Sequence, residues 1–157
     1  MRKIITMLLV LAGSFLGVEA PASAAPLPGY VQFNRIYFDT PGTDLPITNY
    51  KLNQEWVEIV NGTSRTLNTL NWRLRDYAGH TFVFPSRSIP PQTKVYVHTG
   101  KGTNWPAVKD GVLHLYWQSG YYIWNNTWDV ANLYSNTGAR LDSCSWPSTL
   151  AGNVRYC

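Results

Sequence analysis

The stretch Glu55–Gly79, EWVEIVNGTSRTLNTLNWRLRDYAG, decides the fold that we expect of this chain. Its first part, Glu55–Val60, is apolar and rich in residues that favour a pleated strand, and Asn61–Ser64 then supplies turn residues. Trp72–Asp76 alternates, with apolar side chains on one face and arginines on the other. A period of two is typical of a half-buried strand, so the stretch predicts two strands joined by a polar turn.

Short strands of the same kind are expected along the rest of the chain. In the first of them, Val31–Phe38, the apolar residues change from odd to even positions at Asn34-Arg35, which predicts a β-bulge. No amphipathic helical window interrupts the series, and the polar stretch Thr40–Gln54 is expected to be a long loop. The chain is therefore predicted to be an all-β sandwich of about eight or nine strands. The further expected strands are Val31–Phe38, Thr81–Phe84, Thr93–His98, Val112–Trp117, Val130–Tyr134 and Arg140–Cys144.

The first 24 of the 157 residues have the pattern of a secretory signal peptide. Arg2 and Lys3 precede the apolar run Ile4–Val18, and Ala22-Ser23-Ala24 supplies small residues for cleavage. The apolar run is too short and too rich in Gly and Ser for a retained membrane anchor. We therefore expect a secreted, extracellular protein without a membrane span, with one domain at 25–145 and a C-terminal segment at 146–157.

Charge places only weak limits on the partner. Cleavage would remove two basic residues and one acidic residue, so the formal net charge would fall from +4 to +3. The basic residues are scattered, whereas nucleic-acid-binding faces usually cluster them.

Two cysteines, Cys144 and Cys157, lie near the C-terminus. An even number of cysteines in an exported chain favours a disulfide, which would pin the last segment. The bridge would close a loop of about 12 residues, which corresponds to about 3 kcal/mol of stabilisation on a chain-entropy estimate. Two free thiols are the alternative.

No residue pattern predicts catalysis, a metal site or a cofactor. Glu55 and Glu58 are three apart, so on one strand they point to opposite faces and would not flank one bond. We expect them to be exposed or strand-end carboxylates in ion pairs. The three histidines show no reason to converge on a metal; they are His80, His98 and His114.

Two smaller features leave alternatives open. Asp39 and Asp44 lie at the start of the loop Thr40–Gln54, but the ordered ligand spacing of a calcium loop is absent. Asn61-Gly62-Thr63 and Asn125-Asn126-Thr127 fit the N-glycosylation pattern, although Asn61 before glycine also suits a turn.

Aromatic residues are the most informative surplus, with seven Trp and ten Tyr. Five of them crowd around the loop Gln118–Asp129 and form either a contact surface or a small core under that loop. We expect at least one of the consecutive tyrosines to be exposed, Trp124 to lie at the edge of the loop, and Asp129 to accept hydrogen bonds from backbone amides. The candidate ligand-binding residues are Tyr116, Tyr121, Tyr122, Trp124 and Trp128.

Several motifs in order resemble the lamin tail domain, most closely its secreted bacterial versions. The resemblance covers about Val31 to Ser143, nearly the whole mature chain. It implies an immunoglobulin-like β-sandwich without catalytic residues. The Cys144–Cys157 tail is an addition to that pattern. The motifs are EWVEIVN (Glu55–Asn61), WRLRD (Trp72–Asp76), AGHTFVFP (Ala78–Pro85), VYVHTGKGT (Val95–Thr103), LYW (Leu115–Trp117) and WNNTWDVANLY (Trp124–Tyr134).

We accordingly expect a non-enzymatic domain that contacts a protein outside the cell or at its surface. The alternatives are a carbohydrate-binding module, because sugars stack on exposed Trp and Tyr rings, and a nucleic-acid-binding domain. Coplanar exposed rings along one sheet face would favour sugar, whereas rings packed on one another would not.

Overall fold

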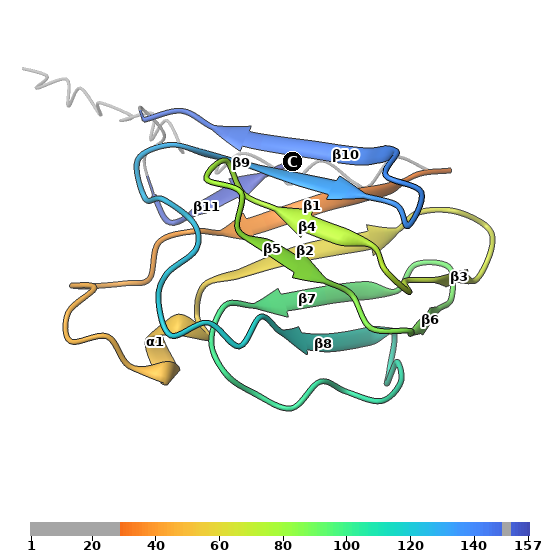
Figure 1. Ribbon diagram of the computed structural model, residues 1–157, viewed down its shortest axis with the longest axis horizontal. Coiled ribbons are helices and arrows are strands. Elements are labelled where there is room, and N and C mark those ends of the chain that lie inside the picture. Colours follow the sequence, from red (N-terminus) through yellow and green to blue (C-terminus); the bar gives the residue numbers. More distant parts are fainter. Residues whose placement is uncertain (1–28, 149–151) are drawn as a thin grey trace, which may run out of the picture.

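The computed structural model describes residues 29–148 and 152–157, and these residues form eleven strands and one short helix. The expected signal peptide, residues 1–24, lies outside this part of the chain. Two main sheets pack face to face, and a two-stranded ribbon lies at one end (Figure 1). The elements are β1 (Val31–Tyr37), α1 (Asn49–Leu52), β2 (Trp56–Asn61), β3 (Leu67–Asn68), β4 (Arg73–Arg75), β5 (Thr81–Val83), β6 (Ser88–Ile89), β7 (Lys94–His98), β8 (Val112–Tyr116), β9 (Asp129–Tyr134), β10 (Arg140–Trp146) and β11 (Val154–Tyr156).

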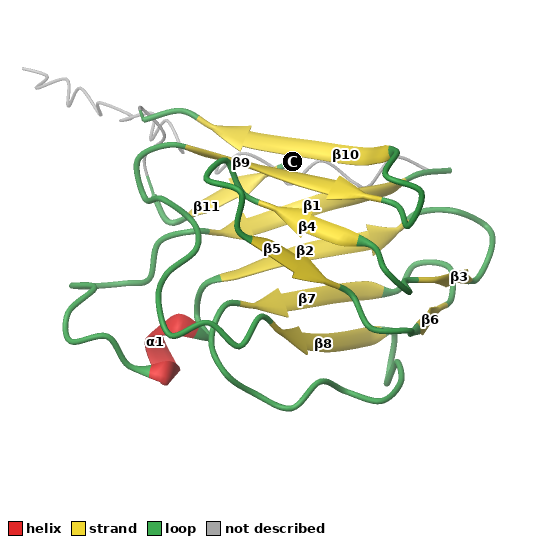
Figure 2. Cartoon of the chain, in the orientation of Figure 1, coloured by secondary structure: helices red, strands yellow, loops and turns green. Residues whose placement is uncertain are grey.

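The larger sheet has the strand order β11-β1-β2-β7-β8, and the smaller has the order β10-β9-β4-β5 (Figure 2). Neighbouring strands run antiparallel, except that β7 and β8 are parallel. Two adjacent parallel strands need a connection that crosses back to the end of the sheet where the first strand begins. The loop 99–111 makes this connection between β7 and β8.

Alternation of apolar residues builds the core, as the sequence predicts. Val95, Val97, Leu113 and Leu115 face inward from the larger sheet, and their neighbours along each strand are more exposed. The expected bulge is also confirmed, because the β1–β2 register shifts between Phe33 and Arg35. Before the bulge the odd-numbered residues Val31 and Phe33 face inward, and after it the even-numbered Ile36 does, so apolar residues on both sides of the bulge are buried. The all-β sandwich is thus confirmed.

Some elements escape the sequence pattern because they are very short. The stretch Thr40–Gln54 is not a structureless loop, since it contains α1, whose first turn is capped by the Thr48 hydroxyl accepting from Lys51 N at 3.2 Å. Strands β3 and β6 are two-residue pieces that pair only with each other. The strand number therefore exceeds the expected eight or nine.

The C-terminal segment joins the sandwich rather than hanging from it. Val154–Tyr156 forms β11, the edge strand of the larger sheet, in antiparallel register with β1. The predicted disulfide Cys144–Cys157 is confirmed, with the two Cα atoms 5.8 Å apart. Because Cys144 lies on β10 and Cys157 follows β11, the bridge ties the edges of the two sheets together. No helix of the described residues is long and apolar enough to cross a membrane.

Candidate binding surface

The aromatic loop Gln118–Asp129 lies at one end of the sandwich, beside the loop that follows β1 and the turn between β4 and β5 (Figure 1). Its middle is anchored in the core. Ile123 and Trp124 are buried, and the Trp124 ring contacts Trp117 and Trp146 edge-on with centroids 5.9 and 6.0 Å away. The expectation that Trp124 lies at the loop's edge is therefore wrong. It is 2% exposed, because the chain turns inward at this point.

Glu55 holds this buried part of the loop in place. Its Oε1 accepts hydrogen bonds from Ile123 N at 2.9 Å, from Trp124 N at 3.3 Å and from the Thr99 hydroxyl at 2.5 Å. The carboxyl is completely buried, and no cation pairs with it among the described residues. Burial raises the pKa of Glu55 to about 8, although the three donors act in the opposite direction. The prediction of an exposed, ion-paired carboxylate is wrong here.

Glu58 is equally buried, but it faces the other side of the sheet and is paired. Its Oε2 accepts from Arg35 Nε at 2.8 Å and lies 2.6 Å from Arg35 Nη2, and its Oε1 lies 3.8 Å from Lys94 Nζ. The ion pair was expected from the sequence, whereas the burial was not. The two glutamates therefore do not face each other as a catalytic carboxylate pair would on either side of a glycosidic bond.

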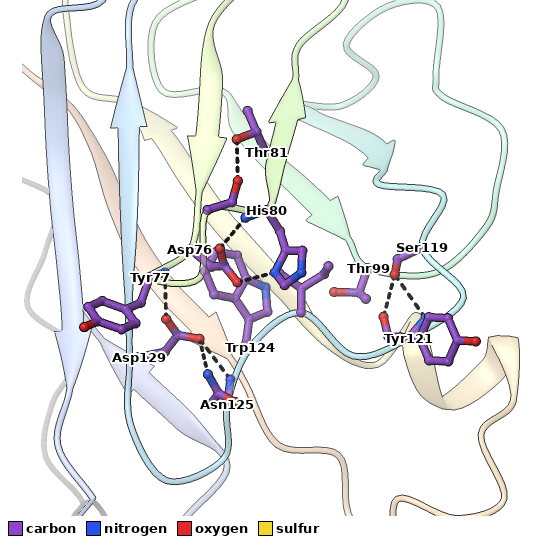
Figure 3. A network of polar contacts seen from close by, with 12 residues as sticks. Asp76, Tyr77, His80, Thr81, Thr99, Ser119, Tyr121, Trp124, Asn125 and Asp129 are labelled. Carbon is purple, nitrogen blue, oxygen red and sulfur yellow. Dashed lines mark hydrogen bonds and ion pairs between the residues drawn. The ribbon is translucent and has the colours of Figure 1, made fainter.

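Two further carboxylates shape the turns at this end (Figure 3). Asp129 accepts from Tyr77 N at 3.0 Å through Oδ1 and from Asn125 N at 3.1 Å through Oδ2, so its expected structural role is confirmed. Asp76 accepts from His80 N at 2.7 Å, and its Oδ2 lies 2.6 Å from His80 Nδ1. These contacts join the β4–β5 turn to the aromatic loop.

Exposed rings surround the anchored part of the loop. Tyr121 is 74% exposed and Trp128 is 43% exposed, whereas Tyr122 is half-buried with its hydroxyl 3.3 Å from Thr40 Oγ1. One of the two consecutive tyrosines is thus exposed, as expected. The Trp128 ring packs edge-on against Tyr77 with centroids 4.5 Å apart. The loop is consequently both a small core and an exposed surface.

The loop after β1 adds exposed apolar residues to the same end. It is tied to the aromatic loop because Asn126 Nδ2 donates to Asp39 Oδ1 at 3.0 Å and to Asp44 Oδ2 at 3.3 Å. Sequence reasoning missed these residues because their stretch shows no periodicity. We call the exposed apolar side chains at this end the loop-end patch, which consists of Leu45, Ile47, Tyr50, Tyr77, Tyr121 and Trp128.

Asp39 and Asp44 lie close together, since both carboxylates accept from the Asn126 amide, and proximity is one condition for the calcium alternative left open above. Burial and the nearby charge of Asp44 raise the pKa of Asp39. However, the amide of Asn126 donates to both carboxylates. Among the described residues no group of three or more His, Cys, Asp or Glu side chains could hold a metal ion.

Tyr116 is not part of the loop-end patch, because it is half-buried on the outer face of the larger sheet. There it belongs to a row of nearly parallel rings. The centroid distances are 5.0 Å from Tyr116 to His98, 5.1 Å from His98 to His114 and 5.2 Å from His114 to Tyr96, and all three pairs are within about 21° of parallel. His98 and His114 lie edge to edge in nearly one plane, because their ring nitrogens are 2.8 Å apart. All four rings are half-buried, so the row meets in part the condition stated above for a sugar platform.

The histidines do not form a three-histidine site. His98 Nε2 lies 2.8 Å from His114 Nδ1, while His98 Nδ1 lies 2.9 Å from Asn53 O. Because a carbonyl only accepts, His98 Nδ1 carries its proton, and in the neutral pair His114 Nδ1 donates to His98 Nε2. Burial lowers the pKa of both rings, which favours this neutral pair. His80 instead contacts Asp76.

The two N-glycosylation patterns differ in access. Asn61 is buried, and its Nδ2 donates to Ile89 O at 2.9 Å and to Arg65 O at 2.9 Å, so its role is that of a turn residue. Asn125 is exposed, and its Nδ2 donates to Asp129 Oδ2 at 3.1 Å.

The family model of the Lamin Tail Domain matches residues 24–148, which include every strand from β1 to β10. No curated protein matches the chain in a sequence comparison.

Proposed function

The chain belongs to the lamin tail domain family, and from this premise we propose that it is an exported, non-catalytic module that binds a protein outside the cell through its loop-end patch. The family has an immunoglobulin-like β-sandwich fold, and in such sandwiches the loops at one end often carry the binding residues. The patch occupies that position here.

The observation that carries this proposal is the gathering of exposed Tyr, Trp, Leu and Ile side chains on three hydrogen-bonded loops. Tyr and Trp lose few torsions on binding and supply large contact areas, so they dominate protein–protein hot spots. Glu55 and Asp129 hold the loop backbone from below. A pre-shaped loop lowers the entropic cost of binding.

Export is supported by two features of the chain. The first is the N-terminal pattern of a signal peptide, with Arg2 and Lys3 before an apolar run. The second is the Cys144–Cys157 disulfide, because such bridges form and persist mainly in oxidising compartments. The exported protein is expected to start near Ala25, which mass spectrometry of culture supernatant measures directly.

Carbohydrate binding is the alternative, and the nearly coplanar, half-buried rings on the outer face of the larger sheet are the observation that favours it. Nucleic-acid binding is the other alternative; the formal net charge of +4 is mild, and any such binding should weaken steeply with salt. A glycan array tests carbohydrate binding by the mature protein, and an oligonucleotide titration tests nucleic-acid binding.

The test of the proposal is a cross-linking pull-down of surface and extracellular proteins with the mature domain. The variants Tyr121→Ala and Trp128→Ala are expected to weaken capture of a specific protein by about fivefold or more, which corresponds to about 1 kcal/mol per hot-spot ring. Tyr30→Ala is the matched control, because Tyr30 is 65% exposed but precedes β1 at the opposite end of the sandwich (Figure 1).

Circular dichroism and thermal melting decide whether the variants keep the fold. We expect the free energy of unfolding to change by at most about 1 kcal/mol for Tyr121→Ala, since the side chain is largely solvent-exposed. Capture that survives both ring variants, or that depends equally on Tyr30, would contradict the proposed surface.

A further inference from the structure

The outer face of the smaller sheet carries a pocket that the loop-end patch does not include. Alternation along β4 leaves Arg73 and Arg75 exposed on either side of the buried Leu74. Strand β5 contributes Thr81 and strand β9 contributes Tyr134 to the same face. The pocket has a volume of about 260 Å³, and it is lined by Arg73, Arg75, Thr81, Tyr134 and Gly138.

Strand register brings a third arginine to this face. Tyr134 is the register partner of Arg73 on one side and of Arg140 on the other. Two positions on the same face of a strand are about 7 Å apart, and directly paired residues on adjacent strands lie about 5 Å apart. Arg73 and Arg140, which are far apart in sequence, therefore flank Tyr134, and Arg75 lies two residues further along β4 on the same face.

These arginines have no acidic partner. In the described residues, none of the ion pairs involves Arg73, Arg75 or Arg140. The two acids nearest in sequence are engaged elsewhere, since Asp76 accepts from His80 N at 2.7 Å and Asp142 accepts from Phe33 N at 2.7 Å. The face is thus positively charged although the chain as a whole is only mildly basic.

The two guanidinium groups make the pocket rich in hydrogen-bond donors. The Thr81 hydroxyl is used, because it donates to Gly79 O at 3.0 Å, and the guanidinium groups remain free to donate. Arg75 lies over the β4–β5 turn, where a Cβ added at Gly79 would be 3.4 Å from Arg75 Nη2. Arginine forks match the geometry of phosphate and carboxylate oxygens, and they are less strongly hydrated than lysine.

We propose that this pocket binds a phosphate group, with Arg73 and Arg75 as the principal donors and Arg140 as a secondary contact. A single guanidinium satisfies a carboxylate, whereas two or three guanidinium groups suit the larger negative charge and the additional oxygens of a phosphate. The ligand is free phosphate or one phosphate of a longer polyphosphate chain, in which case Arg140 contacts the neighbouring group. This site is on a different face from the loop-end patch and does not depend on it.

The test is an NMR titration of the folded mature protein with inorganic phosphate, with tripolyphosphate and, as a carboxylate probe, with acetate, all at constant ionic strength. We expect saturable shifts in the Nε–Hε signals of Arg73 and Arg75 with the two phosphates. Arg73→Gln and Arg75→Gln are each expected to weaken phosphate binding at least tenfold, and Arg140→Gln is expected to weaken tripolyphosphate binding more than phosphate binding.

Arg65→Gln is the matched control, because Arg65 is exposed in the β2–β3 loop and its loss changes the net charge by the same amount. It should change phosphate affinity by less than twofold. Arg73→Lys keeps the charge but loses the fork, so an intermediate loss is expected, and it provides a second readout if the glutamine variant unfolds. Equal effects of Arg65→Gln and Arg73→Gln, shifts spread over all cationic side chains, or acetate binding as tight as phosphate would overturn the proposal.

If only tripolyphosphate binds, the ligand is a chain and not free phosphate. If neither phosphate produces a saturable shift, the pocket is not a phosphate site, and the protein-binding role of the loop-end patch is unaffected.

Discussion

Glu55 and Glu58 are three residues apart and equally inaccessible to solvent, yet their surroundings differ completely. Glu58 lies under Arg35 and Lys94, and so its charge is balanced on the outer face of the larger sheet. Glu55 lies beneath the aromatic loop and contacts only a hydroxyl and two backbone amides. Equal burial therefore says little about a carboxyl until the groups around it are known.

The largest expected effect is at Glu58. We expect Glu58→Gln to lower the free energy of unfolding by about 3 kcal/mol, because it removes the partner of a buried ion pair. The Arg35 side chain is partly solvated, which keeps the loss at the low end of the range for such pairs. Urea unfolding at pH 7 measures the change.

Glu55→Gln is the matched comparison for that variant. An amide oxygen accepts the same three hydrogen bonds and carries no charge, so we expect little loss of stability at neutral pH. A loss as large as that of Glu58→Gln would mean that Glu55 is held ionised, and that the contrast between the two sites is wrong.

The second prediction concerns pH. The folded protein keeps the Glu55 proton up to a pKa of about 8, whereas the unfolded chain loses it near 4.5. Stability from this group is therefore full below pH 4.5 and is lost as the pH rises through 8. We expect the free energy of unfolding to fall by about 1.4 kcal/mol per pH unit between pH 6.5 and pH 8.

The pH range for this measurement starts at 6.5 because the histidine pair also affects stability below that pH. The pKa values of His98 and His114 are lowered by burial, so their contribution to stability is lost as the pH falls below 6.5. The difference between wild type and Glu55→Gln cancels this contribution. A pH profile that is the same in both proteins would contradict the assignment to Glu55.

A smaller effect than that of Glu58→Gln is expected for Arg35→Lys, which sharpens the description of the paired site. Lysine keeps the charge but loses the two-nitrogen contact with Glu58 and the stacking of the guanidinium 5.5 Å from the Trp56 ring centroid. We expect a loss of about 1 kcal/mol in urea unfolding. A larger loss would indicate that the geometry of the pair, rather than its charge, stabilises the strand face.

Local patterns in the sequence were sufficient for much of the fold. The alternation in Thr93–His98 assigns Val95 and Val97 to the core, because successive side chains on a strand point to opposite faces. The parity slip at Asn34-Arg35 locates the bulge for the same reason. The disulfide also followed from the sequence, because the chain contains only two cysteines.

What the sequence by itself determined is therefore the position of most strands, the faces of their side chains and the covalent link, all of which depend on near neighbours along the chain. Only the tertiary structure decided which loop residues are buried. Trp124 and Trp128 have similar local sequences, but one enters the core and the other remains exposed. The burial of Glu55, the pairing of β11 with β1 and the gathering of Arg73, Arg75 and Arg140 likewise depend on segments far apart in sequence. Such contacts are set by how the sheets pack, whereas a pattern of period two gives the face of each residue and not which distant strand lies beside it.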